Sequence, residues 1–373
     1  MFGMLSHREM KFGRWMMMRL DALSPGAVMR APASQPTHNR ATGRDFVDIR
    51  MQGDEKKDAS RKRFRTMARD MAKRYLPMVE GLRNRKATDF DRLVPSEPPK
   101  LAPGQIKDLE DRVSKDQRRL KIGPARREEI DGIVEDYIAM KRILLHRYAV
   151  RIARSAPLLE EIDLDPDPKT PLKADADIAH GARLHLHHDY GRPLHYGVDD
   201  VCDASNENAE VFLQFAGALV ANIETRAIRN RPLALPARDQ QLILIEKARA
   251  IMDAWAFPHA QRVRDMVDVI GSDCQKESLL PNAPLDAGAN AIAILEKEME
   301  TLSFDDELAT VLKYAIANGA ITIERNYGQG GKLWALIELT GTVGLAYGLT
   351  FYRGGFLEKD IDYLRSVTGL ANA

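Results

Sequence analysis

A long amphipathic helix is the strongest structural signal in this chain, and it lies within residues 194–229. The segment opens with a short extended stretch, followed by a turn rich in Asp, Ser and Asn. Ser205 is the predicted N-cap, because its hydroxyl can accept a hydrogen bond from the free backbone amide of Asn208. The apolar residues that recur at helical spacing are Val211, Phe212, Phe215, Ala218, Leu219 and Ile223. This stripe predicts a helix that buries one face in a core.

Length and composition limit the classes of protein that the chain can belong to. Its 373 residues leave room for two or three domains, and its formal net charge is +1. Because the charges nearly cancel, the chain as a whole is not a general polyanion binder. Cys202 and Cys274 are its two cysteines, which excludes a disulfide framework and a cysteine-rich zinc site. Such cysteine usage suits a reducing compartment and predicts a cytoplasmic protein.

The N-terminal half is polar, basic and interrupted by loops. Residues 1–55 have the composition of a disordered leader. Residues 56–193 are predicted to form a helical, basic region, a remnant of an ATPase core under the resemblance described below. Its first helix carries a large excess of Lys and Arg, with apolar residues at steps of three and four from Phe64 to Met78. Two interpretations stay open for this helix: contact with a phosphate backbone, or a solvated helix face.

Further helices are predicted on both sides of the central one. Before it, helices are expected at about residues 105–120 and 125–153, separated by Gly123-Pro124. After it, helices are expected at residues 239–256 and from Pro258 to a C-cap at Gly271. Residues 194–283 are therefore predicted to form a helical domain.

The last unit, residues 284–373, mixes short strands with compact helices. A helix is expected at residues 305–318, a strand at 320–325, a second helix from about Leu333 and a short strand in LTFYRGG. This alternation predicts a winged-helix-like domain. The fold class is thus mainly α: a helical bundle region followed by a small α+β winged-helix-like C-terminal domain. GQGGK is not a phosphate loop, because Asn326 and Leu333 occupy two positions of a Walker motif.

The apolar stretch from Leu333 to Tyr352 is long enough to cross a bilayer. It contains Glu338 and is diluted by Gly and Thr, and the chain around it has the pattern of a soluble protein. A buried helix plus a strand explains it more simply, so no membrane partner is expected.

Five histidines lie within a short stretch: His180, His185, His187, His188 and His195. In a strand, His185 and His187 would point to the same face, as two metal ligands do, and Asp189 could add an oxygen. A metal-dependent hydrolase that uses the His180–His195 cluster is therefore an alternative function. A polar strand or surface loop without metal is the other interpretation, and no second ligand cluster supports the metal.

From about Leu194 to Leu364 the chain resembles the C-terminal region of bacterial P-loop ATPases of the origin-recognition (ORC/Cdc6-like) type. The segments that carry the resemblance are LHYGVDDVCDASNENAEVFLQFAG, PLALPARDQQ, AIANGAITIERNYGQGGKLWALIELTGTVGLAYGL and YRGGF. The resemblance implies that residues 194–283 form a helical lid and residues 284–373 a winged-helix-like domain.

The chain departs from that family where nucleotide hydrolysis is concerned. It has no Walker A motif, no convincing Walker B strand, and no Arg at the start of the lid helix. The sequence therefore favours a non-enzymatic protein without a cofactor, acting in DNA binding or assembly. Arg325, Lys332 and Arg353 are the cations predicted to contact duplex DNA, and scattered surface charge is the competing interpretation. A further alternative is an interaction module that docks on a complete ATPase partner.

Overall fold

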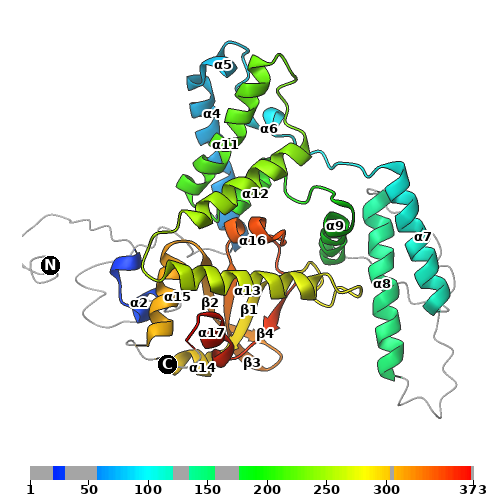
Figure 1. Cartoon of the computed structure of the whole chain (residues 1–373), viewed down its shortest axis with the longest axis vertical. Helices are drawn as coiled ribbons and strands as arrows, with labels where there is room; N and C mark the ends of the chain where they lie inside the picture. Colours follow the sequence, from blue (N-terminus) through cyan, green and yellow to red (C-terminus); the bar gives the residue numbers. More distant parts are fainter. Residues whose placement is uncertain (1–19, 30–56, 121–133, 156–175, 303–305, 371–373) are drawn as a thin grey trace, which may run out of the picture.

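The computed structural model describes residues 20–29, 57–120, 134–155, 176–302 and 306–370. Helices make up most of this part of the chain, and a small four-stranded sheet lies near its C-terminus (Figure 1). The predicted class, a helical bundle region followed by a small α+β domain, is confirmed. The predicted leader lies outside the described residues, except for η1 (Leu20–Ala22) and α2 (Pro25–Met29), which contact α15 (Glu307–Ala317).

One core joins helices that lie far apart in the sequence. Its elements are α4 (Lys57–Tyr75), η2 (Leu76–Met78), α5 (Glu80–Arg83), α6 (Phe90–Leu93), α10 (Gly197–Ala204), α11 (Ala209–Ile228) and α12 (Ala237–Asp253). Phe64 and Phe90 pack edge-to-face against Phe212, with ring centroids 6.2 and 6.4 Å away. Edge-to-face packing is a preferred aromatic arrangement. The predicted basic region and the predicted lid region therefore share this core.

A second core belongs to three helices at one side of the molecule (Figure 1). They are α7 (Pro103–Leu120), α8 (Val134–Ser155) and α9 (Ala176–Tyr190). Leu109, Val113, Ile143 and Leu186 are buried between them. The predicted helices at 105–120 and 125–153 correspond to α7 and α8, and residues 121–133 lie outside the described residues.

The third and largest core lies on one face of the sheet. Its elements are α13 (Ala260–Ser278), β1 (Ala289–Leu295), α14 (Glu296–Glu300), α15, β2 (Ile321–Gln329), β3 (Lys332–Leu339), α16 (Gly341–Tyr347), β4 (Gly355–Glu358) and α17 (Ile361–Val367). The strand order is β2-β3-β1-β4, with β4 parallel to β1 and the other pairs antiparallel. Val263 and Ile270 of α13 pack with Ile292 and Ile337 of the sheet. The boundary predicted at residue 283 therefore falls between two elements of one core.

The helix predicted from about Leu333 is wrong, because this segment is strand β3. Its register with β2 pairs Ile321 with Leu339 and Ile323 with Ile337. The apolar run LWALIEL fits a helix or a strand buried on both faces, so its periodicity could not decide between them. In the fold, Ile337 lies in the large core while Trp334 and Leu336 lie in a small cluster on the other face. The apolar stretch 333–352 is thus a strand followed by a helix and a loop.

The N-terminus of the central helix also differs from the prediction. Residues 197–204 form helix α10, which the prediction of a turn did not include, and the Ser205 hydroxyl donates to the backbone carbonyl of Cys202 at 2.6 Å. The N-cap of α11 is Asn208, whose side chain accepts from the amides of Glu210 and Val211. Asn is as good an N-cap as Ser, so the cap lies three residues later than predicted.

Among the described residues, one helix, α11, is long and apolar enough to cross a bilayer, by length and composition only. Its apolar stripe is nevertheless turned into the protein: Phe212, Phe215, Leu219 and Ile223 are fully buried in the first core. A core helix of a soluble protein has these properties.

The C-cap predicted at Gly271 is wrong, since α13 continues through it to Ser278. Glycine is required there by packing. A Cβ added at Gly271 would lie 2.8 Å from two ring carbons of Tyr347. The missing side chain therefore lets α16 lie directly against α13.

We expect Gly271→Ala to destabilise the protein by about 1–3 kcal/mol, because overpacking at the Tyr347 ring outweighs the gain in helix propensity. Gly217→Ala is the matched control, because Gly217 is also inside a helix but a Cβ added there would meet open space. The control should stabilise the protein by up to about 1 kcal/mol. Urea unfolding of both variants checks this, and equal effects at the two sites would contradict the packing argument.

Candidate functional site

The three cations predicted to bind DNA lie in different surroundings. The Arg325 guanidinium forms an ion pair with Glu296 at 2.6 Å and donates to the backbone carbonyl of Met29 at 3.2 Å. Both charged side chains of this pair are nearly buried. Arg325 therefore holds β2 to α14 and α2, and its charge is neutralised inside the protein.

Arg353 is also paired, whereas Lys332 is exposed. The Arg353 guanidinium lies 3.4 Å from Glu324 and 3.8 Å from Glu338, and it covers the ring of Tyr327 at 5.0 Å. Lys332 follows the turn between β2 and β3, with its ammonium 5.2 Å from the centroid of Trp334. The structure therefore does not gather the three predicted cations into one basic surface.

The helix before the β2–β3 hairpin, α15, would be the DNA-recognition helix of a winged-helix domain. Leu308, Val311 and Leu312 of this helix are fully buried in the sheet core. The cation in the helix, Lys313, lies over the neighbouring Tyr314 ring. Helix α15 thus presents an apolar, packed surface and contacts α2 and η1.

The histidine cluster lies on a helix, so the predicted strand geometry is wrong. His180, His185, His187 and His188 belong to α9, and His195 follows it. Residues two apart on a helix point in very different directions, so His185 and His187 do not share a face. Among the described residues, no group of three or more His, Cys, Asp or Glu side chains is arranged to hold a metal.

Three of these histidines instead hold backbone carbonyl groups. Nδ1 of His187 donates to the carbonyl of Arg192 at 2.9 Å. Nε2 of His188 donates to the carbonyl of Gly348 at 3.1 Å, and Nε2 of His195 to that of Leu349 at 2.7 Å. His188 and His195 therefore donate to two carbonyls that follow α16. Carbonyl groups at the end of a helix have no partner within the helix.

Burial keeps several of these imidazoles neutral. It lowers the pKa of His195 to about 3 and the pKa of His185 to about 4, and it also lowers the pKa of His187. Burial likewise raises the pKa of the Cys202 and Cys274 thiols to about 12, which makes both poor nucleophiles. The cluster therefore supports a structural role more than acid–base or metal chemistry.

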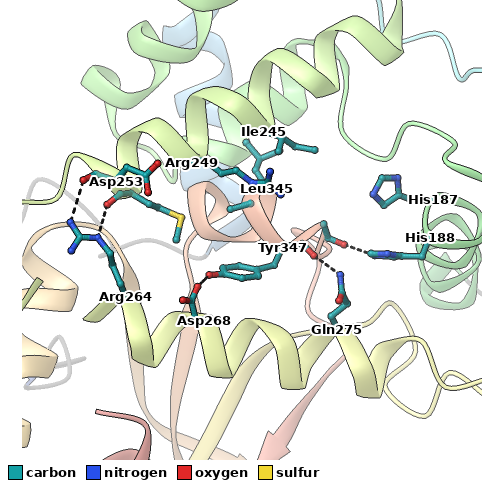
Figure 2. A pocket seen from close by; sticks show the side chains of 13 residues that line it. His187, His188, Ile245, Arg249, Asp253, Arg264, Asp268, Gln275, Leu345 and Tyr347 are labelled. Atoms are coloured by element: carbon teal, nitrogen blue, oxygen red, sulfur yellow. Dashed lines mark hydrogen bonds between the residues drawn. The ribbon is translucent and has the colours of Figure 1, made fainter. Parts of the chain in front are cut away.

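A cavity of about 560 Å³ lies where α9, α12, α13 and α16 meet (Figure 2). The Tyr347 hydroxyl donates to Asp268, and the Gln275 amide donates to the Tyr347 carbonyl at 2.9 Å. Burial raises the pKa of Asp268. Arg264 donates to the carbonyls of Met252 and Asp253, both at 3.2 Å, and so caps the end of α12. Most polar groups of this cavity hold the four helices together.

The basic amphipathic helix is α4, and its charged face is divided: Lys62, Lys73 and Arg74 are exposed, as a solvated face predicts, whereas other arginines meet an acidic helix. Arg65 binds Asp203 at 2.7 Å and Asp199 at 3.2 Å, both on α10. Arg69 binds Asp199 at 2.8 Å and Asp91 at 3.0 Å. Arg65 and Arg69 therefore pack against an acidic helix and are neutralised there. The sequence shows both charge sets, but only the fold brings them together.

A different group of cations gathers where α5 and the C-terminus of α11 meet, at the top of Figure 1. We call it the basic cap, and it consists of Arg83, Arg85, Lys86, Arg226, Arg229 and Arg231. Arg85 joins its two halves by donating to the carbonyl of Ala227 at 2.6 Å and to Asn230 at 3.2 Å. The contributing segments, residues 80–86 and 224–239, contain seven Lys or Arg residues against three carboxylates.

Four side chains of the basic cap are exposed and free of carboxylates. Arg226 is held by Asp239 at 3.4 Å and by the carbonyl of Pro232 at 2.9 Å. Arg83, Lys86, Arg229 and Arg231 are exposed, and within the described part of the chain they form no ion pair. A groove of about 260 Å³ between α11 and α12 is lined by Arg226, Arg229 and Arg231. The sequence alone does not reveal this site, because its halves are separated by about 140 residues.

No protein-family model, curated protein or solved structure matches this chain. The resemblance to origin-recognition ATPases, with the duplex DNA and the complete ATPase partner that it implies, therefore stays a prediction.

Proposed function

We propose that this protein binds the phosphate backbone of nucleic acid through the basic cap, and we assign no reaction to it. The observation that carries the proposal is a set of four exposed cations to which the described residues supply no carboxylate partner: Arg83, Lys86, Arg229 and Arg231. Cations that contact phosphates release counterions from the nucleic acid, which supplies sequence-independent affinity.

The placement of charge favours the basic cap over the C-terminal domain. Arg325 and Arg353 are occupied by carboxylates, and Arg65 and Arg69 of α4 are occupied by α10. A polyanion would have to displace these internal partners, whereas it can reach the basic cap directly. We also propose a cytoplasmic location, where two unpaired cysteines persist as thiols.

The test compares a four-site variant, Arg83→Gln, Lys86→Gln, Arg229→Gln and Arg231→Gln, with the unaltered chain. Fluorescence anisotropy with short labelled oligonucleotides measures affinity between about 50 and 200 mM salt. Each lost phosphate contact lowers the slope of log K against log salt by about 1, so a loss of up to about 3–4 is expected. Affinity at the lower salt should fall at least about tenfold.

The matched control removes four exposed lysines elsewhere: Lys107, Lys115, Lys276 and Lys297. This control lowers the net charge by four, as the four-site variant does, and it should retain most of the affinity for the oligonucleotides. A separate Lys332→Gln variant tests the hairpin predicted from sequence. Equal losses of oligonucleotide affinity in the four-site variant and its control would refute a localised binding site. Absence of oligonucleotide binding by the unaltered chain would refute the proposal.

A further inference from the structure

Three apolar side chains are highly exposed within or next to the segments that carry the basic cap. Tyr75 is 51% exposed at the end of α4, Met78 is 74% exposed in η2, and Ile228 is 84% exposed at the end of α11. Their neighbours Leu76 and Ala227 are buried, so the chain turns these side chains outward while its adjacent residues fill the core. Helix α5 contacts both η2 and α11, so these side chains come from elements that adjoin the basic cap. Single exposed apolar residues are ordinary, but several on elements that adjoin one charged surface indicate an interaction site.

The cations of the basic cap lie at the ends of α5 and α11 and on the segments that follow these helices. Arg83 ends α5, and Lys86 follows it in a left-handed conformation with φ 53°. Arg229 and Arg231 flank Asn230, which is left-handed with φ 55°. Proteins that read duplex DNA usually place a helix or a β-ribbon in the major groove. The basic cap offers two turns that can follow a flexible backbone.

We infer that the basic cap binds single-stranded nucleic acid in preference to duplex, an inference that rests on the proposed function. A duplex presents phosphates and sugars outward and would leave Tyr75, Met78 and Ile228 without apolar partners. An unpaired strand presents base faces, which stack on aromatic rings and pack against aliphatic side chains. Cations bind its phosphates while the apolar group receives its bases.

The test measures affinity for labelled oligo(dT) and for the duplex of the same length with oligo(dA). The unaltered chain should bind oligo(dT) more tightly. Tyr75→Ala should weaken binding to oligo(dT) by about tenfold, because base–aromatic stacking is lost, and should change duplex affinity by less than about twofold. Tyr75→Phe keeps the ring and should retain the affinity for oligo(dT). Because Tyr75 is half-exposed, both variants should keep the circular dichroism of the unaltered chain.

The outcomes separate this inference from the proposed function. Equal or tighter binding to duplex, unaffected by Tyr75→Ala but lost in the four-site cap variant, would overturn the single-strand preference alone. Binding to neither oligonucleotide would overturn both. Binding to phosphatidylserine vesicles in place of either oligonucleotide would overturn both in favour of a membrane surface, since exposed apolar residues beside cations also suit anionic lipid.

Discussion

Replacing Asp203 with alanine is expected to lower the free energy of unfolding by about 3 kcal/mol. The carboxylate is almost completely buried, with its side chain 1% exposed. It accepts two hydrogen bonds from Arg65, at 3.2 and 2.7 Å, and lies 3.6 Å from Arg61. Two-point pairing of this kind is among the strongest side-chain interactions, and its removal leaves partly buried guanidinium groups without their main partner. Urea denaturation of the variant measures the loss.

The chain offers a matched exposed pair as a control. Asp70 lies 2.8 Å from Arg74 on the same helix, α4, and both side chains are more than half exposed. Solvent screens such a pair, so Asp70→Ala should change stability by no more than about 0.5 kcal/mol. A similar decrease in the free energy of unfolding for Asp70→Ala and Asp203→Ala would show that the burial of Asp203 does not determine its contribution to stability.

Acidification below about pH 6.5 is expected to destabilise the protein steeply through its histidines. The pKa values of His195 and His185 are lowered by burial to about 3 and 4 in the folded chain, and the pKa of His187 is lowered as well. Unfolded histidine titrates near 6.5, so between these values the unfolded chain binds more protons. The stabilisation that comes from these neutral histidines is therefore fully present above about pH 6.5. Below that pH the free energy of unfolding falls by up to about 1.4 kcal/mol per pH unit for each histidine.

One carboxyl group opposes this trend. Burial raises the pKa of Asp200 to about 7, so its burial becomes more favourable as pH falls from 7 toward 4. Three histidines outweigh one aspartate, and the net change remains destabilising.

A single substitution isolates the contribution of His195. Glutamine can still donate to the Leu349 carbonyl but does not titrate, so His195→Gln should make the decline below pH 6.5 shallower by about 1.4 kcal/mol per pH unit. Stability at pH 7.5 should fall by about 1 kcal/mol, because stacking on Phe351 at 4.1 Å is lost. Urea unfolding from pH 7.5 to 4.5 measures both effects. Parallel pH profiles for the two proteins would exclude His195 as a source of the acid sensitivity.

Helices with a clear apolar stripe could be predicted from the sequence. The stripe from Val211 to Ile223 is buried in α11 as expected, and the helix predicted at 239–256 is α12. Their periodicity follows directly from which face meets the core. Two predictions were wrong because the local sequence does not decide the structure there. The run LWALIEL fits the periodicity of a helix or of a strand, and a glycine such as Gly271 is typical of a helix C-terminus. Their structures depend on contacts with β2 and with Tyr347.

The candidate site could not be predicted because the sequence does not show which charged residues will pair with one another in the fold. Arg65 and Arg325 look as available as Arg229 and Arg231 when only their neighbours along the chain are known. The fold places carboxylates from distant segments against the first two and leaves the others exposed. An interaction between charges depends on distance and solvent exposure, which arise from packing.

By itself, the sequence determined the mainly helical class, the apolar faces of the central helices and the hairpin strand beginning near Ile321. These follow from local periodicity, which any folded state must satisfy. The tertiary structure decided that α13 and the sheet share a core, that the histidines hold α16 and that four cations of the basic cap stay exposed. These outcomes depend on residues separated by about 20 to 160 positions, and the free energy of such contacts is set by packing and burial instead of chain order.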